Sequence, residues 1–174
     1  MTALSLAEEF GLWPSIHAVI YDRLTPHEAT ALIAQLAALP VKRSHAVQRL
    51  GSYVARGALP VMIRLQFAQE TEQLRQTFLH ELAHACDHLT HQNGSPYRQA
   101  HGAGWQSWMA AFGLPAERVG QSVALTTLRE QRLKVVAICR TCGLEIRRLR
   151  RFDKRKRYVH TECGGRLVPV TERE

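Results

Sequence analysis

Residues 74–86 read Leu74-Arg75-Gln76-Thr77-Phe78-Leu79-His80-Glu81-Leu82-Ala83-His84-Ala85-Cys86. The apolar residues recur at the three- and four-residue spacing that places side chains on one face of an α-helix: Leu74, Phe78, Leu82 and Ala85. The stretch therefore predicts a helix with one buried face. His80, Glu81 and His84 lie off the centre of that face, where an exposed surface would more often present Lys, Arg or Glu.

The spacing of His80 and His84 suits two ligands of one metal ion. Residues four apart on a helix share a face, so both imidazoles can point at a zinc ion while Glu81 stands beside the position left open for water. Glu81 can then act as general base toward that water, which is the division of labour in the HExxH metalloproteases. The alternative is an ordinary amphipathic helix that carries these three residues without a metal.

A catalytic zinc ion needs a third protein ligand. The residues downstream of the motif that could serve are His88, His91, His101 and Glu117. The metzincin pattern fails, because the positions where it requires glycine and histidine hold Asp87 and Thr90. A straight helix carries His88 away from the metal, so we expect it at the surface or behind the ligands. His91 is expected in the loop before the next helix.

His101 differs from these residues because it follows a turn and precedes a new short helix, from which it can fold back onto the metal. The motif and the later segment His101-Gly102-Ala103-Gly104-Trp105 resemble the SprT-like family, in which HExxH is followed by His-Gly-x-x-aromatic. Residues 49–53 and 61–65 resemble the two short strands that precede the metal helix in that family. The resemblance covers the chain from about Arg49 onward and implies that His101 is the third ligand.

Two pairs of potential ligands near the end of the sequence predict a second zinc site. Cys139 and Cys142 form a CxxC pair, His160 and Cys163 form an HxxC pair, and a glycine follows each pair and allows a tight turn. The SprT-like family usually has cysteine at all four positions, so His160 is a departure from its pattern. The alternative is a set of thiols without metal in a basic tail.

Charge is distributed unevenly along the chain. Residues 1–128 contain nine Lys or Arg and nine Asp or Glu, so the formal net charge of +8 belongs to residues 129–174. The densest run consists of Arg147, Arg148, Arg150, Arg151, Lys154, Arg155, Lys156 and Arg157. Such a run is often only a solvated surface. Its nearly single sign and the interleaved Phe152 and Tyr158 favour nucleic acid as partner, since cations release counterions from phosphates and aromatic rings can stack on unpaired bases.

The length of 174 residues allows one sizeable core and a second small unit that a metal could stabilise. No apolar run approaches the length of a membrane span, and the first residues lack the basic region of a signal peptide, so a cytoplasmic protein is expected. Four cysteines in a reducing compartment indicate metal ligands or buried thiols, and Cys86 is expected in the core.

Residues 26–39 predict a packing helix with Thr25 as N-cap. Trp105 and Trp108 are expected to pack in the interior. Residues 120–127 predict a polar connection between the domains.

These features predict an α+β protein with a zincin-like metalloprotease domain at residues 1–127, in which the active-site helix carries HExxH, and a basic zinc-ribbon β-hairpin module at residues 128–174. One catalytic and one structural zinc ion are expected. The resemblance implies a nucleoid-associated enzyme that removes proteins crosslinked to DNA, as Spartan-type proteases do, with DNA favoured over RNA and a protein as substrate.

Two alternatives remain open from the sequence: a non-catalytic nucleic-acid-binding zinc-ribbon protein, and a regulatory peptidase that acts on one protein partner. Tyr97 is a candidate for stabilising the oxyanion and equally a loop aromatic. The substrate, the preferred strandedness of the nucleic acid and the oligomeric state are left open.

Overall fold

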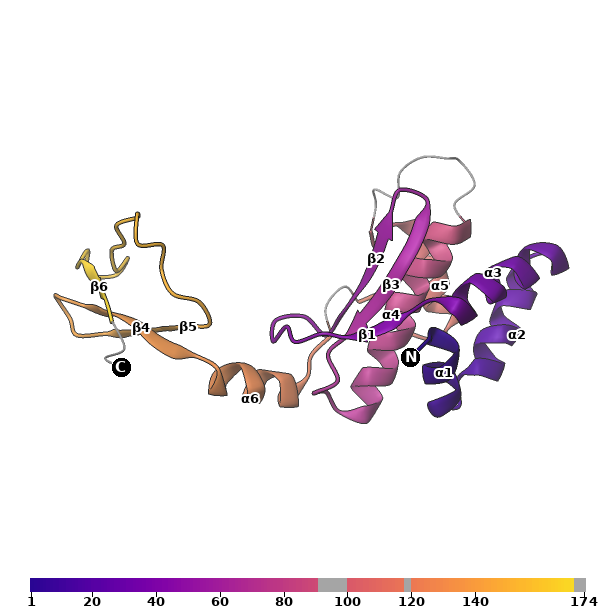
Figure 1. Ribbon diagram of the computed structural model, residues 1–174, viewed down its shortest axis with the longest axis horizontal. Coiled ribbons are helices and arrows are strands. Elements are labelled where there is room, and N and C mark those ends of the chain that lie inside the picture. The colour runs from indigo at the N-terminus through magenta and orange to yellow at the C-terminus, as the bar shows by residue number, and fades with distance from the viewer. Residues whose placement is uncertain (91–99, 118–119, 171–174) are drawn as a thin grey trace. The chain divides into compact units, whose positions relative to one another are not determined.

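The chain divides into two compact units, Met1–Leu125 and Thr126–Glu174. The computed structural model describes residues 1–90, 100–117 and 120–170, which form six α-helices and six β-strands (Figure 1). The expectation of a mixed α+β protein is confirmed. No helix in these described ranges is long and apolar enough to cross a membrane.

Three short helices open the first unit: α1 (Ala3–Glu9), α2 (Trp13–Arg23) and α3 (Pro26–Ala38). Thr25 caps α3 through a reciprocal pair of hydrogen bonds, in which its hydroxyl oxygen accepts from the Glu28 backbone N–H and the Glu28 carboxylate accepts from the Thr25 backbone N–H. The packing helix predicted from residue 26 is confirmed, although it ends one residue early because Leu39 is the C-cap. Leu32 and Leu36 bury the inner face of this helix.

The sheet of the first unit contains β1 (Val41–Arg43), β2 (Gly51–Arg56) and β3 (Leu59–Leu65) in the order β1-β3-β2. β1 runs parallel to β3, and β2 runs antiparallel to it. The two strands predicted near residues 49–53 and 61–65 are present with shifted bounds. β1 was not predicted, because three residues are too few to show an alternating pattern.

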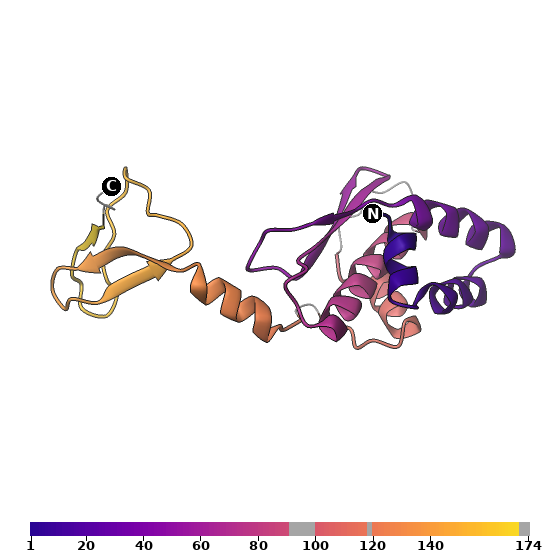
Figure 2. The ribbon, with the colours of Figure 1, turned by 60° about the horizontal axis from the view of Figure 1, so that its bottom comes forward.

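Helix α4 (Thr71–Thr90) contacts β2 and β3 and also packs on α3 and α5 (Ala103–Ala111) (Figure 2). The predicted apolar face is buried, with Phe78, Leu82 and Ala85 fully inside the core. Polar residues on another face of α4 are buried as well, among them Glu81 and His84. The helix therefore serves both the hydrophobic core and a buried polar site.

The polar connection predicted at residues 120–127 is wrong, because helix α6 (Val123–Gln131) occupies most of it. The hydroxyl of Ser122 accepts a hydrogen bond from the Leu125 N–H at 3.1 Å, and the Glu70 carboxylate accepts one from the Ala124 N–H at 2.8 Å. These acceptors satisfy donors that the first turn of a helix otherwise leaves unpaired. One of them comes from a residue more than fifty positions away, which the local composition cannot reveal.

The second unit contains β4 (Lys134–Cys139), β5 (Glu145–Arg148) and β6 (Leu167–Pro169), joined as an antiparallel sheet in the order β5-β4-β6. Its buried apolar cluster consists of Ala137, Cys139 and Leu167, with Ile146, Phe152 and Tyr158 packed against it. A core this small does not usually stabilise a module without a disulfide or a metal.

Candidate metal centres

Three imidazole rings from two segments of the first unit converge. His80 and His84 lie one turn apart on α4, and His101 lies just before α5. The Nε2 atom of His101 is 3.2 Å from Nε2 of His84 and 3.4 Å from Nε2 of His80. The structure thus brings together the three histidines that the sequence predicted as ligands of one ion.

The separations between these nitrogens fit one zinc ion. A tetrahedral ion with Zn–N distances of about 2.0–2.1 Å holds two of its nitrogen ligands roughly 3.3 Å apart. Three nitrogen donors leave a fourth position for water or substrate, which distinguishes catalytic from closed structural zinc sites. The three histidines could therefore hold a metal ion.

Burial keeps two of these histidines in the neutral form that can bind a metal. Loss of solvent, with a further contribution from the neighbouring imidazoles, lowers the pKa of His80 to about 4 and the pKa of His84 to about 3. Both rings are therefore neutral at pH 7. Because a metal binds only the deprotonated nitrogen, protons compete weakly for this site near neutral pH.

Glu81 lies buried between α4 and β2, with 6% of its surface exposed. The Tyr53 backbone N–H donates a hydrogen bond to its carboxylate. A Cβ atom at Gly51 would lie 2.7 Å from Oε1 of Glu81 and 2.8 Å from Cγ2 of Thr77, so β2 approaches the carboxylate this closely because residue 51 has no side chain.

Desolvation sets the acidity of Glu81. Burial raises its pKa to about 8, and the hydrogen bond from Tyr53 opposes part of that rise. A divalent cation beside the carboxyl group would lower the pKa again. A carboxyl group whose pKa lies near the working pH can both accept and release a proton, which is what general acid–base catalysis requires.

His101 reaches the cluster through an uncommon backbone conformation. Its φ angle is 68°, in the left-handed region that non-glycine residues seldom adopt. Gly102 follows as the N-cap of α5. Strain of this kind costs of order 1–3 kcal/mol and persists where surrounding contacts enforce it, often at functional sites.

Trp105 of α5 lines one side of the three imidazoles. It is fully buried, stacks on His84 at a centroid distance of 5.4 Å and meets His80 and His101 edge-on at 4.9 and 4.6 Å. Its indole N–H donates to the His80 carbonyl oxygen at 3.4 Å. The predicted packing role is confirmed, and the structure adds contact with all three rings.

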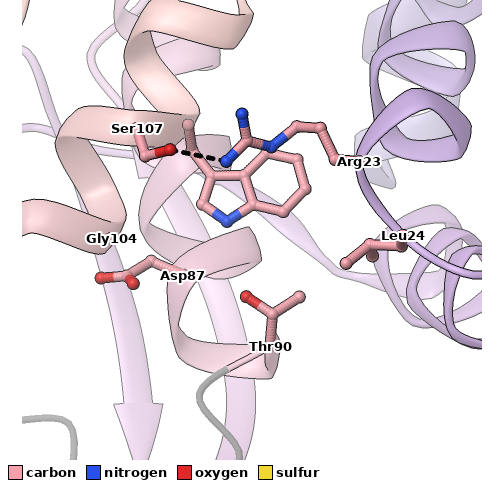
Figure 3. A pocket seen from close by; sticks show the side chains of 7 residues that line it. Arg23, Leu24, Asp87, Thr90, Gly104 and Ser107 are labelled. Carbon is pink, nitrogen blue, oxygen red and sulfur yellow. Dashed lines mark hydrogen bonds between the residues drawn. The ribbon is translucent and has the colours of Figure 1, made fainter.

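Contacts of Arg23 with Ser107 and of Asp87 with Gly104 hold α5 against α2 and α4 (Figure 3). The guanidinium carbon of Arg23 lies 4.6 Å from the Trp108 ring centroid, and its Nη2 donates to the Ser107 hydroxyl at 2.6 Å. On α4, Asp87 packs so closely on Gly104 that a Cβ atom there would clash with the carboxylate. These contacts fix the helix start from which the third histidine projects.

Two of the other candidate ligands, His88 and Glu117, lie in the described part of the chain and do not join the histidine cluster. His88 is buried, which excludes the surface position but not the second expected position, behind the ligands. Its Nε2 lies 3.0 Å from the Gly57 carbonyl oxygen and its Nδ1 lies 2.7 Å from the Tyr53 hydroxyl. Because the carbonyl can only accept, Nε2 carries the proton and the tyrosine donates to Nδ1. Glu117 is exposed. Two residues considered above lie outside the described ranges: His91 and Tyr97.

Two residues of β2 that contact Glu81 were not predicted from the sequence: Gly51 and Tyr53. A glycine at the start of a strand is unfavourable unless another group approaches the backbone closely. That signal could have drawn attention to Gly51. The hydrogen bonds of Tyr53 cannot be predicted from the neighbouring sequence, because its partners lie on α4.

Four potential ligands also converge in the second unit, from Cys139, Cys142, His160 and Cys163. Sγ of Cys163 is 3.5 Å from Sγ of Cys139 and 3.6 Å from Sγ of Cys142, and Nδ1 of His160 is 3.3 Å from Sγ of Cys142. Tetrahedral zinc with Zn–S near 2.3 Å separates such ligands by roughly 3.6–3.8 Å. The free nitrogen of His160 lies 3.6 Å from the Glu162 carboxylate, which favours Nδ1 as the metal-facing atom.

Glycines close the turn after each ligand pair, as predicted. Gly143 and Gly164 have φ angles of 74° and 69°, and their N–H groups donate to the carbonyl oxygens of Cys139 and His160. A hydrogen bond from the Cys142 backbone N–H helps to lower the pKa of Cys139 to about 6. The turn therefore favours the thiolate form that binds zinc.

The basic cluster of the second unit is exposed at every position: Arg147, Arg148, Arg150, Arg151, Lys154, Arg155, Lys156 and Arg157. The two aromatic residues among them behave differently. Phe152 and Tyr158 stack on each other, with centroids 4.1 Å apart and planes inclined by 22°, and both pack against the small core. Both rings are partly buried, so less of their surface is left for the stacking on bases that the sequence suggested.

Comparison with known proteins gives a family match that covers most of the first unit. The model of the SprT-like family matches residues 36–126, just over half of the chain, a span that includes α4 and the third histidine. No curated protein and no solved structure matches the chain.

Proposed function

The chain belongs to the SprT-like family, and on that premise we propose that it is a zinc-dependent metalloendopeptidase that cleaves proteins bound or crosslinked to DNA. The observation that carries the proposal is the convergence of three imidazole nitrogens, two of them from the helix that also carries the buried carboxyl group of Glu81. A purely structural zinc site would have four protein ligands and no need of that carboxyl group.

The chemistry divides among four side chains and one backbone N–H group. His80, His84 and His101 would hold zinc, which supplies a water of lowered pKa and polarises the scissile carbonyl. Glu81 accepts a proton from the attacking water and delivers it to the leaving amine. The Tyr53 N–H holds the carboxylate in place during both transfers.

We assign proteolysis to residues 1–127, as a zincin-like domain, and recruitment of the enzyme to a basic zinc ribbon at residues 128–174. Cys139, Cys142, His160 and Cys163 would hold a second, structural zinc ion. The exposed basic cluster supports DNA as the partner that brings protein substrates to the enzyme. The proposed place of action is accordingly the nucleoid in the cytoplasm.

The test is cleavage of a DNA-binding protein crosslinked to DNA, followed by gel electrophoresis, with and without the DNA. Glu81→Gln should keep zinc and lose ~10²–10⁴ in rate, because a general base is removed. Glu117→Gln is the matched control, since that carboxylate is exposed, and should cleave like the parent. Parental activity in Glu81→Gln would contradict the mechanism. Equal cleavage with and without DNA would instead favour a regulatory peptidase that acts on one protein partner.

A further inference from the structure

We propose that the basic cluster binds the phosphodiester backbone of nucleic acid without stacking on its bases, and that it therefore binds duplex DNA more tightly than a single strand of the same length. This inference rests on the proposed function, in which DNA is the partner, and adds how the DNA is recognised.

The aromatic residues of the second unit are already engaged. Phe152 and Tyr158 are the only Phe, Tyr or Trp in residues 126–174. One face of Phe152 lies on Tyr158, and the Arg148 guanidinium lies 4.9 Å from the Phe152 centroid. The Tyr158 hydroxyl accepts a hydrogen bond from the Asp153 N–H at 3.3 Å. Proteins that bind single strands gain affinity by stacking bases on free aromatic faces. In this pair the two rings stack on each other and pack against the small core instead.

The charged side chains are placed for phosphate contacts. All eight basic residues of the cluster are exposed. Among the described residues, Glu145 pairs with Arg147 at 3.3 Å, and Asp153 accepts a hydrogen bond from the backbone N–H of Arg155. Exposed cations gain affinity by displacing counterions, and a duplex presents a charge about every 1.7 Å against about every 3.4 Å for one strand. Without stacking to compensate, the duplex is the stronger ligand.

The experiment measures fluorescence anisotropy of the full zinc-loaded chain, carrying Glu81→Gln to prevent cleavage. Three probes of equal length are compared: duplex DNA, a single strand, and a single strand whose bases have been removed. The two single strands should bind within about twofold of each other and the duplex more tightly. The log–log salt slope should be about 0.9 per contacted phosphate for the duplex and about 0.7 for the single strands.

Charge-reversal variants test whether the basic cluster is the surface that binds DNA. Arg155→Glu with Lys156→Glu should weaken binding and flatten the salt slope. Arg56→Glu with Arg64→Glu makes the same change of charge at exposed positions of the first unit and should leave binding unchanged. Phe152→Leu keeps an apolar side chain against the small core and should leave affinity for both kinds of probe unchanged.

The outcomes separate this inference from the function it rests on. A tenfold or greater loss of affinity on removal of the bases would overturn the inference, and so would a loss confined to single strands in Phe152→Leu. In either case DNA recruitment would stand. Absence of binding to every probe would overturn both the inference and the DNA-directed part of the proposed function.

Discussion

Replacing Gly51 by alanine tests whether the strand beside α4 positions the general base. The added Cβ would lie 2.7 Å from Oε1 and 2.9 Å from Cγ of Glu81, whereas ordinary contacts begin near 3.4 Å. The carboxylate or the strand must therefore move by about 0.7 Å, and misplacement of catalytic groups by about 1 Å can cost 10²-fold in rate. We expect kcat to fall about 10–10²-fold in Gly51→Ala, with little change in KM.

The assay is steady-state cleavage of a peptide substrate, with zinc content and thermal unfolding measured on the same samples. Ser52→Ala is the matched control, because neighbouring residues on a strand point to opposite faces. The histidines are untouched, so zinc binding should persist in both variants. A folded, zinc-loaded Gly51→Ala protein with parental kcat would refute the reasoning, since it would mean that catalysis does not depend on this placement of Glu81.

Three further results are expected. His101→Ala should lose one zinc ion per chain in elemental analysis. Unchanged zinc content would mean that a residue other than His101 is the third ligand. The parent should contain two zinc ions and Cys142→Ser one; a single ion that survives the cysteine substitution would exclude the ribbon site. In metal-free Glu81→Gln, the melting temperature should fall as pH drops from about 6.5 to about 4, because unfolding lets His80 and His84 take up protons that they resist in the folded state. Calorimetry would check this, and a melting temperature that rises over the same interval would contradict the burial of neutral histidines.

The sequence alone predicted the features that depend on neighbours along the chain. The apolar residues of α4 share a face because of the helical repeat, and the same repeat aligns His80 with His84. The CxxC and HxxC pairs predict turns for a similar reason, since each closes within a few residues and ends at a glycine. The third histidine was expected from its place at the start of a new helix and from the family resemblance.

Tertiary structure decided what surrounds those residues. Gly51 and Glu81 are thirty positions apart, and only the packing of β2 on α4 shows that the glycine makes room for the carboxyl group. The same packing buries His88 against Tyr53, and the folding of the second unit stacks Phe152 on Tyr158 and partly buries both rings. Periodicity and spacing determine which residues can share a helix face or a turn. Contacts between separate elements depend on how those elements pack, and that packing is determined by the whole buried surface. The environment of the proposed general base therefore could not be predicted from the local sequence.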